Sequence, residues 1–109
     1  MKGSFEAVLR IERTDPDRLE IALDQVMEEL LRLQVEDPAI GGSLADGEVE
    51  ITMTVDGDSV EETLATAAGI LRTALHAAGF FTPSWPQLQQ APAADPLQAD
   101  VEKLTLVPA

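Results

Sequence analysis

The 109-residue sequence has no cysteine and no tyrosine, and its aromatic residues are three Phe and one Trp. Without cysteine the chain has no disulfide, no thiolate metal site and no thiol nucleophile. It also lacks a Ser-His-Asp arrangement, a zinc-ligand spacing and a nucleotide-binding fingerprint. We therefore predict no catalytic residues, no cofactor and no metal ion.

Basic residues are scarce as well. Seven Lys and Arg stand against 20 Asp and Glu, which gives a formal net charge of -13. This charge repels the phosphate backbone of nucleic acids and anionic lipid surfaces. We expect neither a nucleic acid nor a membrane as a partner, whereas a basic protein surface or a cation is compatible with the charge.

Long apolar runs are also missing. The N-terminal segment carries Glu6, Arg10 and Glu12 where a signal peptide needs an uninterrupted apolar stretch. The most apolar window, residues 63–81, is rich in Ala and is interrupted by Arg72 and His76, so it falls short of a spanning helix. We expect a cytoplasmic protein in which this window forms a packed helix.

The length suits one hydrophobic core, so we predict a single domain over residues 1–109. Two segments alternate with the period of a half-buried strand. The first spans residues 5–12, and the second spans residues 48–55 between turn signals at residues 46–47 and 56–57. The expected core positions of the two strands are Phe5, Ala7, Leu9, Ile11, Val49, Ile51, Met53 and Val55.

A first helix is predicted between these strands. Thr14 and Asp17 fit a capping pattern, and Pro16 suits a first helical turn. The helix should end near Glu36, because Pro38 disfavours helical geometry in the residue before it. Its apolar stripe is Leu19, Ala22, Leu23, Val26, Met27, Leu30 and Leu33.

A second helix is predicted after residue 58. Ser59 and Glu62 form a capping box at its start, and Gly79 suits a left-handed cap at its end. Its apolar stripe is Val60, Leu64, Ala67, Ala68, Leu71, Leu75 and Ala78. The small Ala residues favour close packing of this helix against a sheet.

Three further segments complete the expected fold. Residues 39–45 contain Gly41 and Gly42 and suit a short, bulged strand at a sheet edge. Residues 80–99 form an extended Pro/Ala/Gln-rich connection, and residues 101–107 a last strand with Leu104 and Leu106 in the core. This order predicts a ferredoxin-like βαββαβ sandwich, an α+β fold with an antiparallel sheet and two helices on one face. The alternative omits the short strand and gives a three-stranded βαβαβ sheet.

The remaining polar candidates suit structural roles better than chemistry. His76 has no neighbour in the sequence that would orient it as a base, and we expect a solvated histidine near a helix C-terminus. The densest acidic group, Asp56, Asp58, Glu61 and Glu62, fits no EF-hand and suits a helix start. The glycines at positions 41, 42 and 47 precede no helix and have no nearby Lys or Arg, so they suit turns and bulges rather than a phosphate loop.

The outer sheet face should be polar. Its expected residues are Glu6, Val8, Arg10, Glu12, Glu48, Glu50, Thr52 and Thr54, none of them aromatic. Single-stranded RNA is stacked on aromatic side chains in domains of this shape, so RNA binding of that kind is excluded. The carboxylates also oppose apolar packing of two sheets, and Arg10 should form exposed ion pairs with its acidic neighbours.

The aromatic residues are concentrated in one short stretch, with Phe80, Phe81 and Trp85 close together among prolines. We expect Phe80 to be buried behind Gly79, while Trp85 covers the core edge or a second subunit. The three aromatics are also a possible protein-interaction site.

We therefore predict a non-enzymatic interaction or accessory module that binds a protein partner or itself as a homodimer. The alternative is a small-molecule-binding regulatory domain or small enzyme with a pocket between the helices and the connection at 80–99.

Overall fold

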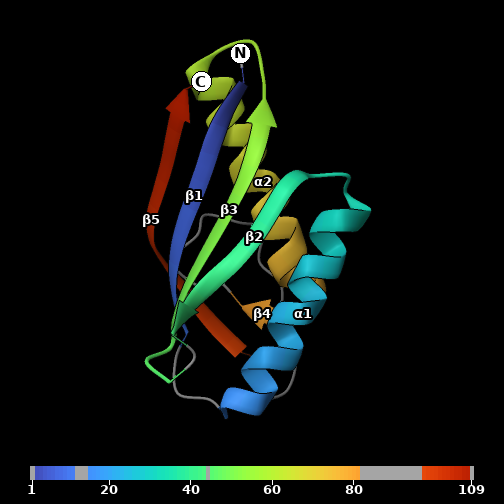
Figure 1. Cartoon of the computed structure of the whole chain (residues 1–109), viewed down its shortest axis with the longest axis vertical. Coiled ribbons are helices and arrows are strands. Elements are labelled where there is room, and N and C mark those ends of the chain that lie inside the picture. Colours follow the sequence, from blue (N-terminus) through green and yellow to red (C-terminus); the bar gives the residue numbers. More distant parts are fainter. Residues whose placement is uncertain (1, 12–14, 44, 82–96, 109) are drawn as a thin grey trace.

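The computed structural model describes residues 2–11, 15–43, 45–81 and 97–108, and Figure 1 shows a twisted sheet with two helices against one face. The elements, in chain order, are β1 (Lys2–Ile11), α1 (Pro16–Arg32), β2 (Glu36–Ser43), β3 (Glu48–Asp56), α2 (Val60–Ala77), β4 (Phe80–Phe81) and β5 (Leu97–Pro108). The strand order across the sheet is β2-β3-β1-β5-β4. The two longest strand pairings place β1 between β3 and β5, both antiparallel to it.

The first four strands of that order, with α1 and α2, form the ferredoxin-like βαββαβ arrangement, so the predicted fold is confirmed. The three-stranded alternative is wrong, because β2 forms eight residues of strand and pairs antiparallel with β3. β2 is longer than predicted and begins at Glu36. The irregular register lies between Glu36 and Ala39, before the glycines rather than at them.

The start of α1 differs from the prediction by one residue. Asp15, not Thr14, is the N-cap, and its side chain accepts a hydrogen bond of 3.1 Å from the backbone N–H of Asp17. Pro16 then occupies the first turn, where its missing N–H leaves no helical hydrogen bond unmade.

The end of α1 comes at Arg32, so the prediction of a helix reaching Glu36 is wrong. Gln34 adopts a left-handed conformation with φ 62°, and its N–H bonds to the Leu31 carbonyl. The N–H of Val35 bonds to the Leu30 carbonyl, which completes a Schellman motif. The helix therefore stops through its own cap, four residues before the position that Pro38 indicates.

The caps of α2 are those predicted from the sequence. The Ser59 hydroxyl accepts a hydrogen bond of 3.1 Å from the N–H of Glu62. At the other end Gly79 has φ 92°, and its N–H bonds to the His76 carbonyl. This left-handed position turns the chain from α2 into β4.

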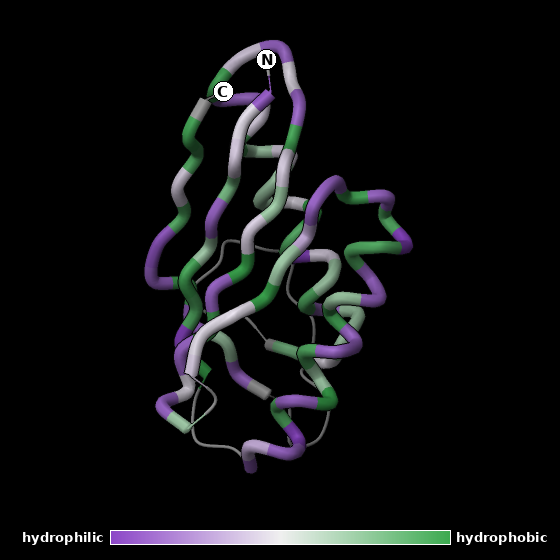
Figure 2. The backbone as a smooth tube through the Cα atoms, in the orientation of Figure 1, coloured by the Kyte–Doolittle hydropathy of each residue, from purple (hydrophilic) through white to green (hydrophobic). Residues whose placement is uncertain are grey.

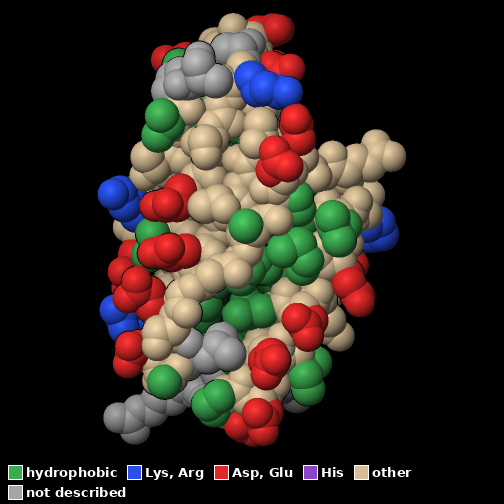
Figure 3. Space-filling view, viewed as in Figure 1, with side chains coloured by type: hydrophobic (Ala, Val, Ile, Leu, Met, Phe, Trp, Pro, Cys, Tyr) green, Lys and Arg blue, Asp and Glu red, His purple; other side chains and the backbone are tan. Residues whose placement is uncertain are grey.

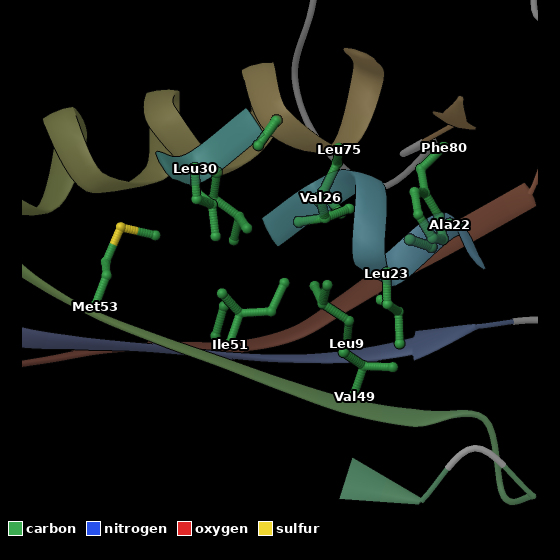
Figure 4. Packing of buried hydrophobic residues seen from close by; sticks show 14 of the residues in the cluster. Leu9, Ala22, Leu23, Val26, Leu30, Val49, Ile51, Met53, Leu75 and Phe80 are labelled. Atoms are coloured by element: carbon green, nitrogen blue, oxygen red, sulfur yellow. The ribbon is translucent and has the colours of Figure 1, made fainter. Parts of the chain in front are cut away.

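The core lies between the helices and the sheet, and Figure 4 shows apolar side chains from both layers pointing toward one another. Its fully buried large residues include Phe5, Leu9, Leu30, Ile51 and Leu71. Figure 2 shows the alternation of hydrophobic and hydrophilic residues along the strands that makes this packing possible. All the predicted core positions of β1 and β3 are buried.

Two predicted stripe positions are wrong. Leu33 is 38% exposed because α1 has ended before it, and Val60 is 45% exposed at the first residue of α2. Leu104 and Leu106 are partly buried against the core, as expected. The last strand is longer than predicted and begins at Leu97, because Leu97 and Gln98 pair in parallel with the short β4.

Candidate functional site

A groove of about 310 Å³ lies between α1 and β2, at one edge of the sheet. We call it the α1–β2 groove. Its lining is Glu20, Leu23, Asp24, Met27, Ile40, Gly41 and Gly42. Figure 3 shows this region as a hollow in which hydrophobic side chains gather, with acidic side chains along its border.

The groove exists because β2 brings little side-chain volume to its wall. Ile40 is partly buried against the core, but the two residues that follow it are glycines. A Cβ atom at Gly42, whose φ is 117°, would overlap the carbonyl oxygen of Glu48. A side chain is therefore excluded at position 42 by the backbone of β3, whereas a Cβ atom at Gly41 would meet no atom within 4 Å.

The opposite wall is one face of α1. Glu20, Asp24 and Met27 follow one another at intervals of four and three residues, which places them on the same side of a helix. Leu23 lies beside them and is 8% exposed, while Glu20 and Asp24 are exposed. The helix thus presents an apolar floor flanked by two carboxylates one turn apart.

The groove borders an open sheet edge. β2 is the outermost strand on its side of the sheet, and in the described part of the chain no strand pairs with its second side. Successive residues of a strand in an antiparallel pair direct their N–H and C=O groups alternately to the two sides. Alternate residues of the stretch before Gly42 therefore direct their backbone N–H and C=O groups away from β3.

Of the aromatic residues selected from the sequence, Phe80 is placed in the core. It lies in β4, is 3% exposed and points into the apolar cluster, as Figure 4 shows, so its expected burial is confirmed. Trp85 and the side chain of Phe81 lie outside the described part of the structure. The hypothesis that the three aromatics bind a protein stays a prediction.

His76 lies near the end of α2 and is half-buried rather than freely solvated. Burial lowers the pKa of His76 below its ordinary value, and the positive charge of Arg72 lowers this pKa further. The expectation that a protonated His76 favours the helix C-terminus is therefore opposed by its surroundings.

The acidic group around the start of α2 is divided between two elements and their junction. Glu61 and Glu62 lie in the first helical turn, where carboxylates interact favourably with the helix dipole. Among the described residues no group of three or more His, Asp or Glu side chains has an arrangement that would hold a metal ion.

Arg10 makes a different ion pair from the expected one. Among the described residues its ion-pair partner is Glu102 of β5, at 2.6 Å, and the expected partner Glu12 lies outside the described structure. β5 has a register irregularity opposite Val8 and Leu9, which gives Glu102 no direct partner across β1. The hydrogen bond to Glu102 raises the pKa of Arg10, and both side chains remain largely exposed.

The groove does not lie where the sequence predicts a pocket. That pocket was expected between the helices and residues 80–99, of which residues 82–96 lie outside the described structure. The groove residues were missed because α1 and β2 are brought together by the fold. The available signal was the pair Glu20 and Asp24 beside an apolar stripe, together with adjacent glycines in an edge strand.

The chain matches no protein-family model and no curated protein. In the described residues no helix is both long enough and apolar enough to cross a membrane.

Proposed function

We propose that this protein is a non-enzymatic interaction module that binds a basic segment of a partner protein in the α1–β2 groove. The observation that carries the proposal is an apolar floor between an open strand edge and two exposed carboxylates. Each of these features suits a different part of a peptide: its side-chain stems, its backbone and its charged groups.

Lys and Arg side chains fit the groove on chemical grounds. Their methylene stems pack on apolar surface while the charged head stays in water or meets an anion. Leu23, Met27 and Ile40 provide the apolar surface, and Glu20 and Asp24 provide the anions. A guanidinium or ammonium group at the rim would thus be paired without being buried.

The charge of the whole chain supports the same kind of partner. A net charge of -13 on a small surface attracts a basic segment over about a Debye length and speeds its association. Salt screens this attraction, so raising the ionic strength should lower the association rate more than it changes the dissociation rate.

The groove lining also supports binding rather than catalysis. Among the described residues of the lining, the ionisable groups are the two carboxylates, and none carries a hydroxyl or imidazole group. Nucleophilic catalysis needs a nucleophile within reach of a base, and this lining contains no such pair.

A second candidate function rests on the size of the groove. Its volume of about 310 Å³ is at the lower end of the range of small-molecule sites, which is roughly 300–1,000 Å³. An amphipathic amine would place its chain on the apolar floor and its ammonium group beside Glu20 or Asp24. Such a ligand would make the protein a small-molecule-binding regulatory domain.

The proposal is tested with a fluorescein-labelled, end-capped heptapeptide of alternating Thr and Lys, by fluorescence anisotropy at low salt. We compare Asp24→Lys with Glu28→Lys, which makes the same change of charge on the same helix at an exposed position outside the groove lining. Asp24→Lys should weaken binding about tenfold, and Glu28→Lys about twofold.

If the two variants lowered the affinity for the peptide equally, binding would depend only on net charge, and the groove would have no part in it. Hexylamine is added as a competitor to examine the second candidate. Displacement of the peptide by hexylamine at a concentration similar to that of the peptide would favour small-molecule binding over the proposed function.

A further inference from the structure

We infer that the partner segment binds as an additional β-strand on the open edge of β2, with Lys or Arg at alternate positions facing Glu20 and Asp24. This inference rests on the proposed function and specifies the conformation and the sequence pattern of the partner. It follows from the edge geometry of β2, from the spacing of the two carboxylates and from the position of α1.

The second half of β2 pairs with β3 without a register shift, and within it Gly42 departs from regular strand geometry with φ 117°. Residues 39–43 pair in continuous register with β3, from Ala39 opposite Thr52 to Ser43 opposite Glu48. Ala39, Gly41 and Gly42 are exposed and have little or no side chain to shield the backbone. An extended segment can therefore approach the open edge and exchange main-chain hydrogen bonds with it.

The start of β2 limits the length of such a segment. Asp37 has φ 50°, and Pro38 has no backbone N–H to donate. Strand addition is therefore confined to residues 39–43, which suits a partner segment of about five to seven residues.

The spacing of the carboxylates matches a strand. Glu20 and Asp24 are four residues apart in α1, which is a rise of about 6 Å along the helix axis. Residues i and i+2 of a strand are about 6.6–6.8 Å apart and point to the same face. Two basic side chains at i and i+2 of the added strand would thus meet the two carboxylates in turn.

The position of α1 determines which face of the added strand has side chains in contact with the protein. Figure 1 shows α1 beside β2 on the helix-covered face of the sheet, and the groove lies between them. Side chains of the added strand that point to this face would lie over Met27 and Leu23, with their charged heads near the carboxylates. Those that point to the other face would meet only Ala39 and Gly41, so their identity should matter little.

A second copy of this chain is a poor occupant of the same edge. Pairing β2 with β2 of another copy would bring Glu20 and Asp24 of both copies together, and each copy has a net charge of -13. Like charges brought together in this way oppose association. The charge pattern therefore selects a basic segment of a different protein.

The test is an N-methyl scan of the alternating Thr and Lys heptapeptide, with one backbone amide methylated at a time. An N-methyl group blocks a main-chain hydrogen bond to β2 and is tolerated where the N–H points to solvent. We expect a loss of about three- to tenfold at every second residue and less than about twofold at the residues between them. An isomeric peptide with its three Lys residues adjacent should bind about fivefold more weakly, because only alternate residues face α1.

The two proposals fail in distinguishable ways. If N-methylation has no alternating effect while Asp24→Lys still weakens binding more than Glu28→Lys, strand addition is wrong and the groove remains the binding site. If the two charge variants bind every peptide equally, the proposed function itself is wrong. Equal binding of the alternating peptide and its isomer would also contradict strand addition, because binding would then not depend on having Lys at alternate positions.

Discussion

Replacing Leu71 with alanine measures how much the packing of α2 against the sheet contributes to stability. Leu71 has 0% exposure in the second helix, whereas Leu31 in the first helix is 58% exposed. The two Leu→Ala changes have the same effect on helix propensity, so their difference reports burial. The variant removes three carbon atoms, worth about 0.8 kcal/mol each, and leaves a cavity that adds to this loss. We expect Leu71→Ala to lower the free energy of unfolding by about 3 kcal/mol.

The measurement is urea unfolding followed by circular dichroism. With an m-value of about 2 kcal/mol/M, a loss of about 3 kcal/mol moves the midpoint down by about 1.5 M. Leu31→Ala should change the free energy of unfolding by less than about 0.5 kcal/mol. Leu71→Asp should be more damaging than Leu71→Ala, because it buries an unpaired charge. Midpoints for Leu71→Ala and Leu31→Ala that agree within error would refute the assignment of Leu71 to the core.

Three further predictions concern a cap, a glycine and a histidine. Ser59→Ala removes the acceptor for the Glu62 N–H and should cost about 1 kcal/mol in urea unfolding, whereas Ser4→Ala on the exposed sheet face should be nearly neutral. Gly42→Ala should lower the free energy of unfolding by about 1–3 kcal/mol, because the φ of residue 42 is 117° and a Cβ atom there would overlap Glu48. Gly41→Ala should change stability little, because the added methyl group meets open space. Equal thermal midpoints for the two variants would contradict this. In the folded chain the pKa of His76 lies below its ordinary value of 6.5. Between the two pKa values the unfolded chain therefore binds more protons than the folded chain. Stability should then fall as the pH drops from about 6.5 through the folded-state pKa. His76→Gln should lack this part of the pH dependence, as measured by the thermal midpoint across that range.

The strands and the caps of α2 could be predicted because each depends on nearby residues. The alternation in β1 and β3 requires only that one face of each strand is buried. Ser59 and Gly79 occupy cap positions that few other residue types occupy as readily.

The end of α1 could not be predicted in the same way, because its left-handed cap residue is Gln34 rather than glycine. A non-glycine residue at such a position gives no sign of a helix end in the sequence, so the prediction depended on the next helix-terminating signal, which is Pro38. The pairing of β4 with β5 was missed for a related reason, since two residues are too few to show a period.

The α1–β2 groove depends on contacts between residues far apart in the sequence. Glu20 and Asp24 are ordinary exposed carboxylates on an amphipathic helix, and Gly41 and Gly42 are ordinary residues of an edge strand. Their significance comes from the β2-β3-β1-β5 order, which leaves β2 outermost beside α1. The residues could be identified from the sequence, but their proximity could not.

The acidic charge and the open edge are best understood together. An unpaired edge strand offers hydrogen bonds to any extended chain, including the edge strand of another copy of the same protein. Glu20, Asp24 and Asp37 lie on or beside this edge and oppose the approach of a similarly charged copy. In the proposed function the same charges would attract a basic strand, so that one arrangement of carboxylates would both limit self-association and select the partner. Neutralising Glu20 and Asp24 should therefore weaken the binding of a basic segment and, at the same time, lower the barrier to pairing between copies.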